Sequence, residues 1–270
     1  MPTPLHVVTA GAGPRIVLVH GSAADHATWT IQLASRLRDR FTLCAYDRRG
    51  TGGSVDPARA DDLDVAEASV GDHADDLIGL LAGDPAIVVG SSFGAVVVLE
   101  AARRRPALIR GMVLCEPPLA ASDDAPSVPT EFLARFDELV ASDGGEAAAE
   151  FFLRTVISEQ AYERMPRAYQ SRSRALWRQI RGDCRALAAY RVDYPTLASV
   201  TVPALLLGGD RSAPFFRPTL DALAAHLGRA RLAILAGAGH MLHAEAPRAF
   251  HDRVVELADA LGQTAAVPGA

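Results

Sequence analysis

The sequence predicts an α/β protein built on one mostly parallel sheet flanked by helices. Runs of continuous apolar residues recur along the chain, which is typical of parallel strands buried on both faces. Segments with the apolar spacing of helices separate these runs. Between residues 120 and 194 the strand signal disappears and only helical patterns remain, which predicts a helical insertion in the second half of the chain.

Each of the predicted strands is short and ends at a glycine, a proline or a polar residue. They are Leu5–Thr9, Arg15–His20, Phe41–Asp47, Ile87–Ser92, Gly111–Glu116, Val202–Gly209 and Arg231–Ala236. The first of these is expected at an edge of the sheet. In open α/β sheets, ligands bind at the carboxyl ends of the strands, so the loops that follow these runs are the places to search for a site.

The predicted helices fall into two groups. One group alternates with the strands: Thr28 to about Arg38, Asp64–Leu81, the segment after Ser92, Phe215–Leu227 and Glu245–Leu261. The other group forms the insertion: Pro129–Val140, Gly145–Ile157 and Glu159–Arg181. We therefore divide the chain into a sheet domain, residues 1–118 and 196–263, and a helical insertion, residues 119–195.

Composition limits the function classes. The chain has 270 residues, 49% of them hydrophobic and 22% charged, and no apolar run approaches the length needed to cross a bilayer. Residues 1–4 carry neither a basic segment nor an apolar stretch, so we expect a cytoplasmic protein. A net charge of −5 without a long basic run argues against nucleic acid as a partner. Whether the chain is a monomer or a homodimer stays open.

The cysteines and histidines do not predict a metal site. The three cysteines are far apart in the chain, and two of them, Cys44 and Cys115, lie inside apolar strand runs. Such residues act as small buried hydrophobes in a reducing compartment. Zinc sites require closely spaced Cys or His ligands, and the sequence has none so placed. We expect no metal and no organic cofactor.

The most informative stretch is the pentapeptide Gly90–Ser91–Ser92–Phe93–Gly94. An apolar run precedes it, and small apolar residues follow it without a proline, which predicts a strand, a sharp turn and a buried helix. At such a turn the serine adopts a strained backbone conformation, and the two glycines avoid collisions with neighbouring backbone. The N-terminus of the following helix then favours negative charge close to Ser92.

This pentapeptide, the His20–Gly21 pair after a strand and the Asp47–Arg48–Arg49–Gly50 loop together resemble the α/β-hydrolase superfamily, from the first strand to the last helix. The resemblance implies that Ser92 is the nucleophile on its elbow. It implies oxyanion-hole N–H groups from Ser22 and Phe93. It also implies that the helical insertion caps the active site, with His26 and Trp177 among the candidates for the substrate pocket.

The base and the acid complete the expected catalytic set. His240 lies in a loop of small residues after the final strand, which matches the family order of nucleophile, acid and histidine. Many members carry the acid in a Gly-x-x-Asp pattern after the strand that here ends near Leu207, but Asp210 is out of step with it. Glu116 follows the preceding strand and stands before two prolines. We favour Glu116 and keep Asp210 as the alternative.

The expected function is a cofactor-independent serine hydrolase that cleaves an ester or lactone of a small to medium, partly apolar substrate through an acyl-enzyme. A serine at position 92 excludes the family's aspartate-nucleophile dehalogenases and epoxide hydrolases. Two alternatives remain. One is a cofactor-free lyase, cyclase or C–C bond hydrolase that uses the same serine and histidine. The other is a ligand receptor with slow turnover.

Overall fold

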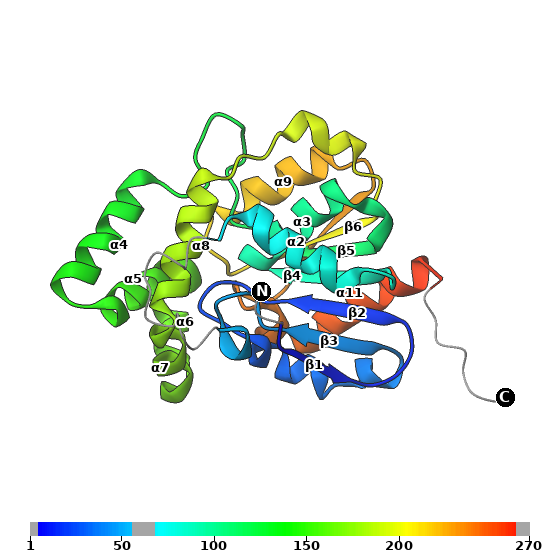
Figure 1. Cartoon of the computed structure of the whole chain (residues 1–270), viewed down its shortest axis with the longest axis horizontal. Helices are drawn as coiled ribbons and strands as arrows, with labels where there is room; N and C mark the ends of the chain where they lie inside the picture. The colour runs from blue at the N-terminus through cyan, green and yellow to red at the C-terminus, as the bar shows by residue number, and fades with distance from the viewer. Residues whose placement is uncertain (1–4, 56–67, 263–270) are drawn as a thin grey trace.

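The computed structural model describes residues 5–55 and 68–262, and it contains a sheet with helices on both faces (Figure 1). The sheet has seven strands in the order β1-β3-β2-β4-β5-β6-β7. Only the edge strand β1 is antiparallel to its neighbour. The predicted fold class, a mostly parallel sheet flanked by helices, is confirmed, and the edge position predicted for the first strand is also correct.

The strands lie close to their predicted positions. They are β1 Val7–Ala10, β2 Arg15–Val19, β3 Thr42–Tyr46, β4 Ala86–Ser91, β5 Ile109–Cys115, β6 Ala204–Gly209 and β7 Ala230–Leu235. Strands β5 and β6 are in parallel register, with Cys115 beside Leu207, and β6 continues beyond this pair to Gly209. Glu116, which follows β5, therefore lies beside the last residues of β6.

Alternate residues of the strands contribute to two separate hydrophobic cores. Val17 and Val19 of β2 face one core, which is covered by α2 (Val70–Leu81), α3 (Phe93–Arg104) and α9 (Phe216–His226). Ile16 and Leu18 face the other core. That core is covered by α1 (Thr30–Leu33), α10 (Leu242–Glu245) and α11 (Pro247–Ala260). Burial on both faces explains why the strands read as continuous apolar runs.

Short 3₁₀ turns connect several of these elements: η1 His26–Trp29, η2 Arg36–Asp39, η3 Gly52–Ser54, η5 Pro106–Leu108 and η6 Tyr194–Ser199. They correct one prediction. The helix expected from Thr28 to Arg38 is divided into η1, α1 and η2, because the Ser35 side chain accepts a hydrogen bond from the Leu37 N–H and starts a new turn.

Another predicted helix is also divided. The segment Glu159–Arg181 contains α6 (Glu159–Arg164), α7 (Arg167–Ala175) and the start of α8 (Trp177–Ala189). The first break falls at Pro166, which cannot continue a helix from the preceding turn. The final helix, predicted from near Glu245 to Leu261, is α11, which begins at Pro247. The first residues of the helix predicted over Asp64–Leu81 lie outside the described residues, and α2 begins after a capping box formed by Ser69 and Asp72.

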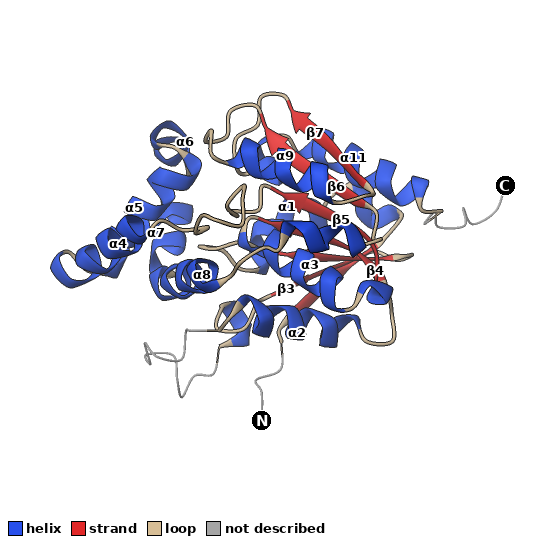
Figure 2. Ribbon diagram, turned by 90° about the horizontal axis from the view of Figure 1, so that it is seen from above, coloured by secondary structure: helices blue, strands red, loops and turns tan. Residues whose placement is uncertain are grey.

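The helical insertion, α4–α8, lies beside the carboxyl ends of the strands (Figure 2). Its first two helices are α4 (Thr130–Ser142) and α5 (Gly145–Ile157). The insertion has its own hydrophobic cluster, which also takes in Ala23 and Met241 from the loops after β2 and β7. The predicted boundary at residue 118 falls between β5 and α4, whereas the boundary at residue 196 falls inside η6, which packs against the sheet.

Among the described residues, none of the helices is long and apolar enough to span a bilayer.

Candidate active site

Ser92 occupies a sharp turn between β4 and α3. Its backbone has φ 54° and ψ −122°, a conformation that is unfavourable for any residue other than glycine. A Cβ on Gly90 would lie 2.5 Å from the Gly94 carbonyl oxygen, and one on Gly94 would lie 2.4 Å from the Val19 carbonyl oxygen. The glycines are therefore required by close packing at this turn, for the reason that the sequence suggested.

Glu116 follows β5 directly and is the second strained residue at this edge. Its φ is +44°, and its side chain is buried. One carboxylate oxygen lies 2.7 Å from Nδ1 of His240, and the other accepts the Gly209 N–H at 2.8 Å. A buried carboxylate is costly without such partners. Strain and burial together hold this carboxylate against the histidine ring.

His240 is held on several sides. Its ring stacks on Phe216 at the start of α9, with 4.3 Å between centroids and 9° between planes. The carboxylate of Glu245 accepts the N–H groups of Gly239 and Met241, at 3.1 and 3.2 Å. Glu245 therefore fixes the backbone on both sides of the histidine. Sequence reasoning missed this role, although a carboxylate five residues after a candidate catalytic histidine was a visible signal.

Ser92 and His240 line the same small cavity, of about 40 Å³, at the carboxyl edge of the sheet. Among the described residues, no hydrogen bond joins the serine hydroxyl to the imidazole. Catalytic hydrogen bonds are often long in enzymes without substrate and shorten when substrate binds. Apolar residues of the helical insertion form much of the wall: Phe152, Leu153, Val156, Ile157 and Met165.

A larger hollow of about 550 Å³ adjoins this cavity. The two share lining residues, among them Thr28, Met165 and Tyr169. The Tyr169 hydroxyl lies 3.2 Å from Thr28 Oγ1, which in turn lies 3.1 Å from Nε2 of His243. A hydrogen-bonded connection thus runs from α7 to α10 through Thr28, which lines both the cavity and the hollow. Burial lowers the pKa of His243 to about 3, so this ring is neutral at neutral pH.

The two expected oxyanion donors belong to the loop after β2 and to the start of α3. A Cβ on Gly21 would come within 2.9 Å of the Ser92 Cβ, so the loop after β2 lies directly against the serine. Ser22, the next residue, lines the cavity. Phe93 is the first residue of α3, where the backbone N–H has no acceptor within its own helix. Both N–H groups therefore belong to segments that adjoin Ser92.

Asp210, the alternative acid, is not brought to the histidine. Its side chain is exposed, and its carboxylate accepts the N–H of Gly237 at 2.8 Å, in the loop after β7. The Nδ1 atom of His240 is already occupied by Glu116. Between the two carboxylates that the sequence left open, only Glu116 contacts the imidazole.

The two residues suggested for the substrate pocket lie elsewhere. The His26 ring turns toward the sheet domain, where Nδ1 lies 2.8 Å from Asp47, and neither hollow beside Ser92 includes it among its lining residues. Trp177 is absent from the same linings. It packs against Gly145, where an added Cβ would collide with the indole at 2.1 Å, and Arg178 stacks on its ring. Trp177 therefore belongs to the interior packing of the insertion.

The structure also brings together a group that the sequence did not reveal. Potential ligand atoms of His6, His26 and Asp47 lie within 4.8 Å of one another. However, the oxygens of Asp47 already accept N–H groups of His26 and Gly53, at 2.7 Å each. This carboxylate therefore closes the loop after β3, which is the structural role that the sequence predicted for the loop.

Comparison with known proteins agrees with this geometry. A sequence model of the alpha/beta hydrolase family matches residues 16–253, and the chain belongs to that family. It is therefore an α/β hydrolase, as the resemblance of its motifs implied. Both the enzyme class and the family expected from the sequence are confirmed.

Individual relatives carry hydrolase names. The chain is 31% identical over 223 residues to a 2-(acetamidomethylene)succinate hydrolase of Mesorhizobium japonicum, covering 77% of this chain and 74% of that protein. It resembles the crystal structure of an alpha/beta hydrolase from Sphaerobacter thermophilus, with a TM-score of 0.76, 28% identity and coverage of 94% and 95%. The fold also matches an enol-lactonase from Burkholderia xenovorans, with a TM-score of 0.77, 24% identity and coverage of 94% and 96%.

Proposed function

We propose that the protein hydrolyses a carboxylic ester or lactone through a covalent acyl-enzyme on Ser92. The observation that carries this proposal is the 2.7 Å contact between Glu116 and His240, within the cavity that Ser92 also lines. A serine hydroxyl is a weak nucleophile at neutral pH and needs a base to take its proton. An imidazole that is oriented by a carboxylate supplies that base.

Each residue then has a defined role. Nε2 of His240 takes the Ser92 proton as the serine oxygen attacks the substrate carbonyl, and Glu116 holds the ring with its proton on Nδ1. The N–H groups of Ser22 and Phe93 stabilise the negative oxygen of the tetrahedral intermediate. His240 protonates the leaving alcohol and later activates the water that releases the acid. The strain at Ser92 and Glu116 supports this assignment, because strained residues gather at functional sites.

The helical insertion acts as a cap in this proposal. A cavity of about 40 Å³ has room for little more than a few water molecules, whereas the adjoining hollow is more than ten times larger. A substrate with a small group at the reacting carbonyl therefore fits best, with its larger and partly apolar portion in the outer space. Larger acyl groups require movement of α5 or α7.

The names of similar proteins support a hydrolase, because one relative is described as a 2-(acetamidomethylene)succinate hydrolase and one protein of the same fold as an enol-lactonase. No observation on the described residues favours a lyase or a receptor over a hydrolase. A serine-directed probe would react with Ser92 in a receptor as well as in a hydrolase, but a receptor would not turn over a substrate. Labelling alone therefore does not distinguish the two functions.

The test is multiple turnover on a panel of p-nitrophenyl esters and small lactones, with the Ser92→Ala variant as control. We expect turnover of short-chain esters by the native chain and none above background by the variant. A fluorophosphonate probe should label Ser92 in the native chain only. Labelling without turnover on any substrate would reject the proposal in favour of a receptor or a lyase.

A further inference from the structure

We propose that the buried ion pair between Arg48 and Asp183 positions the oxyanion-hole loop and thereby makes catalysis depend on docking of the helical insertion. This inference rests on the proposed function. Arg48 follows β3 in the sheet domain, and Asp183 lies on α8 of the insertion. The pair therefore joins two parts of the molecule that are 135 residues apart in the chain.

The pair is bidentate and buried. Arg48 Nη1 donates to Asp183 Oδ1 at 3.0 Å, and Nη2 donates to Oδ2 at 2.6 Å. The side chains are 1% and 4% exposed. A buried ion pair is a weak source of stability, because the cost of removing two charges from water offsets most of their attraction. The other contacts of the two side chains indicate a role in positioning.

The rest of the Arg48 side chain holds the loop after β2. Its Nε donates to the His20 carbonyl at 3.1 Å, and Nη2 also donates to the Gly21 carbonyl at 3.2 Å. The guanidinium lies over the ring of Phe93, 4.5 Å from its centroid. A single planar cation thus contacts the two residues that precede Ser22 and the residue that carries the second proposed oxyanion donor.

Asp183 holds the third residue of the same loop. Its Oδ2 accepts a hydrogen bond from the Ser22 hydroxyl at 2.7 Å. All three residues from His20 to Ser22 are therefore anchored by the ion pair, two through backbone carbonyls and one through a side chain. The backbone N–H of Ser22 belongs to this anchored segment.

His20 completes the arrangement from within the loop. Its Nδ1 lies 2.8 Å from the Gly21 carbonyl oxygen, and its Nε2 accepts the Arg48 backbone N–H at 3.0 Å. Burial, together with the nearby Arg48 charge, lowers the pKa of His20, so the ring is neutral. A neutral ring with its proton on Nδ1 satisfies both contacts. The loop is thus fixed by a continuous network rather than by one bond.

The physical consequence follows from the geometry that an oxyanion hole requires. Its donors must lie within about 3 Å of the developing negative oxygen, and a displacement of about 1 Å lowers the rate about 100-fold. If α8 moves away from the sheet domain, Arg48 loses its counter-charge and Ser22 loses its acceptor. The oxyanion donor is then released at the same time as the cavity opens. Asp183 is therefore a positioning residue that acts through Ser22 and Arg48.

The test compares Asp183→Asn with Asp137→Asn. Asp137 lies on α4 and pairs with Arg181 and Arg185 of α8, so these ion pairs join two helices within the insertion. We expect Asp183→Asn to lower kcat on a short-chain ester about 10- to 100-fold with KM within about twofold. We expect Asp137→Asn to leave both values within about twofold of the native chain.

Two further measurements separate positioning from general loss of structure. Affinity for a trifluoromethyl ketone, which forms a tetrahedral adduct on the serine, should fall in proportion to kcat/KM in Asp183→Asn, whereas affinity for the carboxylate product should not change. Combining Ser22→Ala with Asp183→Asn should cost less than the sum of the two single changes, because both act on one contact. Unchanged kcat, or equal loss of affinity for both ligands, would overturn the proposal.

Asp183→Asn leaves a buried cation without its partner and can therefore prevent folding. In that case the double variant Arg48→Met with Asp183→Leu replaces the pair by apolar groups, and it should fold while showing the same fall in kcat. Native activity in that folded double variant would also overturn the proposal. Absence of ester turnover in the native chain would instead reject the proposed function, so the two failures are distinguishable.

Discussion

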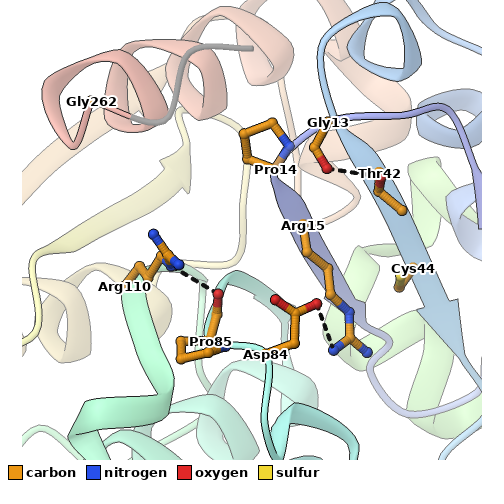
Figure 3. A pocket seen from close by; sticks show the side chains of 9 residues that line it. All are labelled: Gly13, Pro14, Arg15, Thr42, Cys44, Asp84, Pro85, Arg110 and Gly262. Atoms are coloured by element: carbon orange, nitrogen blue, oxygen red, sulfur yellow. Dashed lines mark hydrogen bonds and ion pairs between the residues drawn. The ribbon is translucent and has the colours of Figure 1, made fainter. Parts of the chain in front are cut away.

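The two ends of the parallel sheet differ in the chemical groups that line their hollows. At the amino ends of the strands lies an open hollow of about 460 Å³, lined by residues such as Arg15, Asp84 and Arg110 (Figure 3). At the carboxyl ends, the cavity beside Ser92 is only about 40 Å³. The adjoining hollow at that end measures about 550 Å³, so each end has a space of several hundred Å³. The hollow at the amino ends is lined by none of the proposed catalytic residues.

Chemistry separates the two ends more clearly than volume. In the amino-end hollow, the Arg15 and Asp84 side chains are 3.7 Å apart, with Asp84 mostly exposed, and Arg110 donates to the Pro85 carbonyl (Figure 3). Such contacts between exposed groups contribute little energy. The carboxyl end instead combines strained backbone at Ser92 and Glu116 with buried, mutually oriented charged groups. Strained backbone and buried charge therefore distinguish the two ends, whereas both ends carry a large hollow.

The largest effect is expected at the carboxyl end. Replacement of Ser92 by alanine removes the attacking oxygen and should lower kcat by about 10⁴-fold or more, with the fold retained. The measurement is steady-state turnover of a short-chain ester together with circular dichroism. Substantial turnover by a folded Ser92→Ala protein would contradict an active site at the carboxyl end, because the strained serine would then have no catalytic role.

The next effect separates the two carboxylates. Glu116→Gln keeps the size of the side chain but removes the charge that orients His240, so kcat should fall by up to about 10⁴-fold. Asp210→Asn changes a carboxylate that only accepts the Gly237 N–H, and kcat should stay within about threefold. The same ester assay measures both. The reverse order of effects would transfer the role of the acid to Asp210.

The stability of the chain should also depend on pH, because buried neutral histidines lie near the carboxyl end. Burial lowers the pKa of His243 to about 3, whereas the unfolded side chain titrates near 6.5. Between these pH values the unfolded state binds a proton that the folded state does not. The free energy of unfolding should therefore fall with decreasing pH by about 1.4 kcal/mol per pH unit for this histidine.

Urea unfolding at pH 7 and pH 5 measures this effect. The His243→Gln variant lacks the titrating group, so its stability should change less between the two pH values than that of the native chain. An equal change in both proteins would show that His243 is not the source. Burial also lowers the pKa of His20 and His73, so part of the pH dependence should remain in the variant.

The smallest effect is expected at the amino end. Arg110→Ala removes a surface contact with the Pro85 carbonyl, and kcat should stay within about twofold while stability changes by less than about 0.5 kcal/mol. Ester turnover and thermal unfolding measure the two quantities. A clear loss of activity in this variant would mean that the open hollow contributes to function, and the contrast between the two ends would fail.

Patterns within short stretches of sequence account for the correctly predicted strands and for the turn at Ser92. The strands follow from continuous apolar runs, and the turn at Ser92 follows from glycines that tolerate no Cβ. The breaks at Ser35 and Leu176 were not predicted, since a side-chain cap and a local turn override helical spacing there. Pro166 was visible in the sequence, and the break beside it was predictable from local chemistry.

The contacts of the site were harder to predict, because they join residues far apart in the chain. The pairing of Glu116 with His240 depends on the relative height of two strand ends, and the sequence left two carboxylates open. The contact of Asp183 with Arg48 and Ser22 depends on how α8 docks, which no local pattern encodes. His26 and Trp177 were assigned to the pocket from residue type and approximate position, whereas in the structure their rings contact Asp47 and Gly145.

The register of β5 and β6 has a consequence for any evolutionary exchange of the acid between the two strands. Glu116 stands one residue beyond the paired Cys115, whereas the first residue after β6, Asp210, stands three residues beyond the paired Leu207. The loop after β6 would therefore have to fold back before a carboxylate there could replace Glu116. Position 209 itself is obstructed, since a Cβ there would collide with the Ala238 carbonyl oxygen at 2.2 Å.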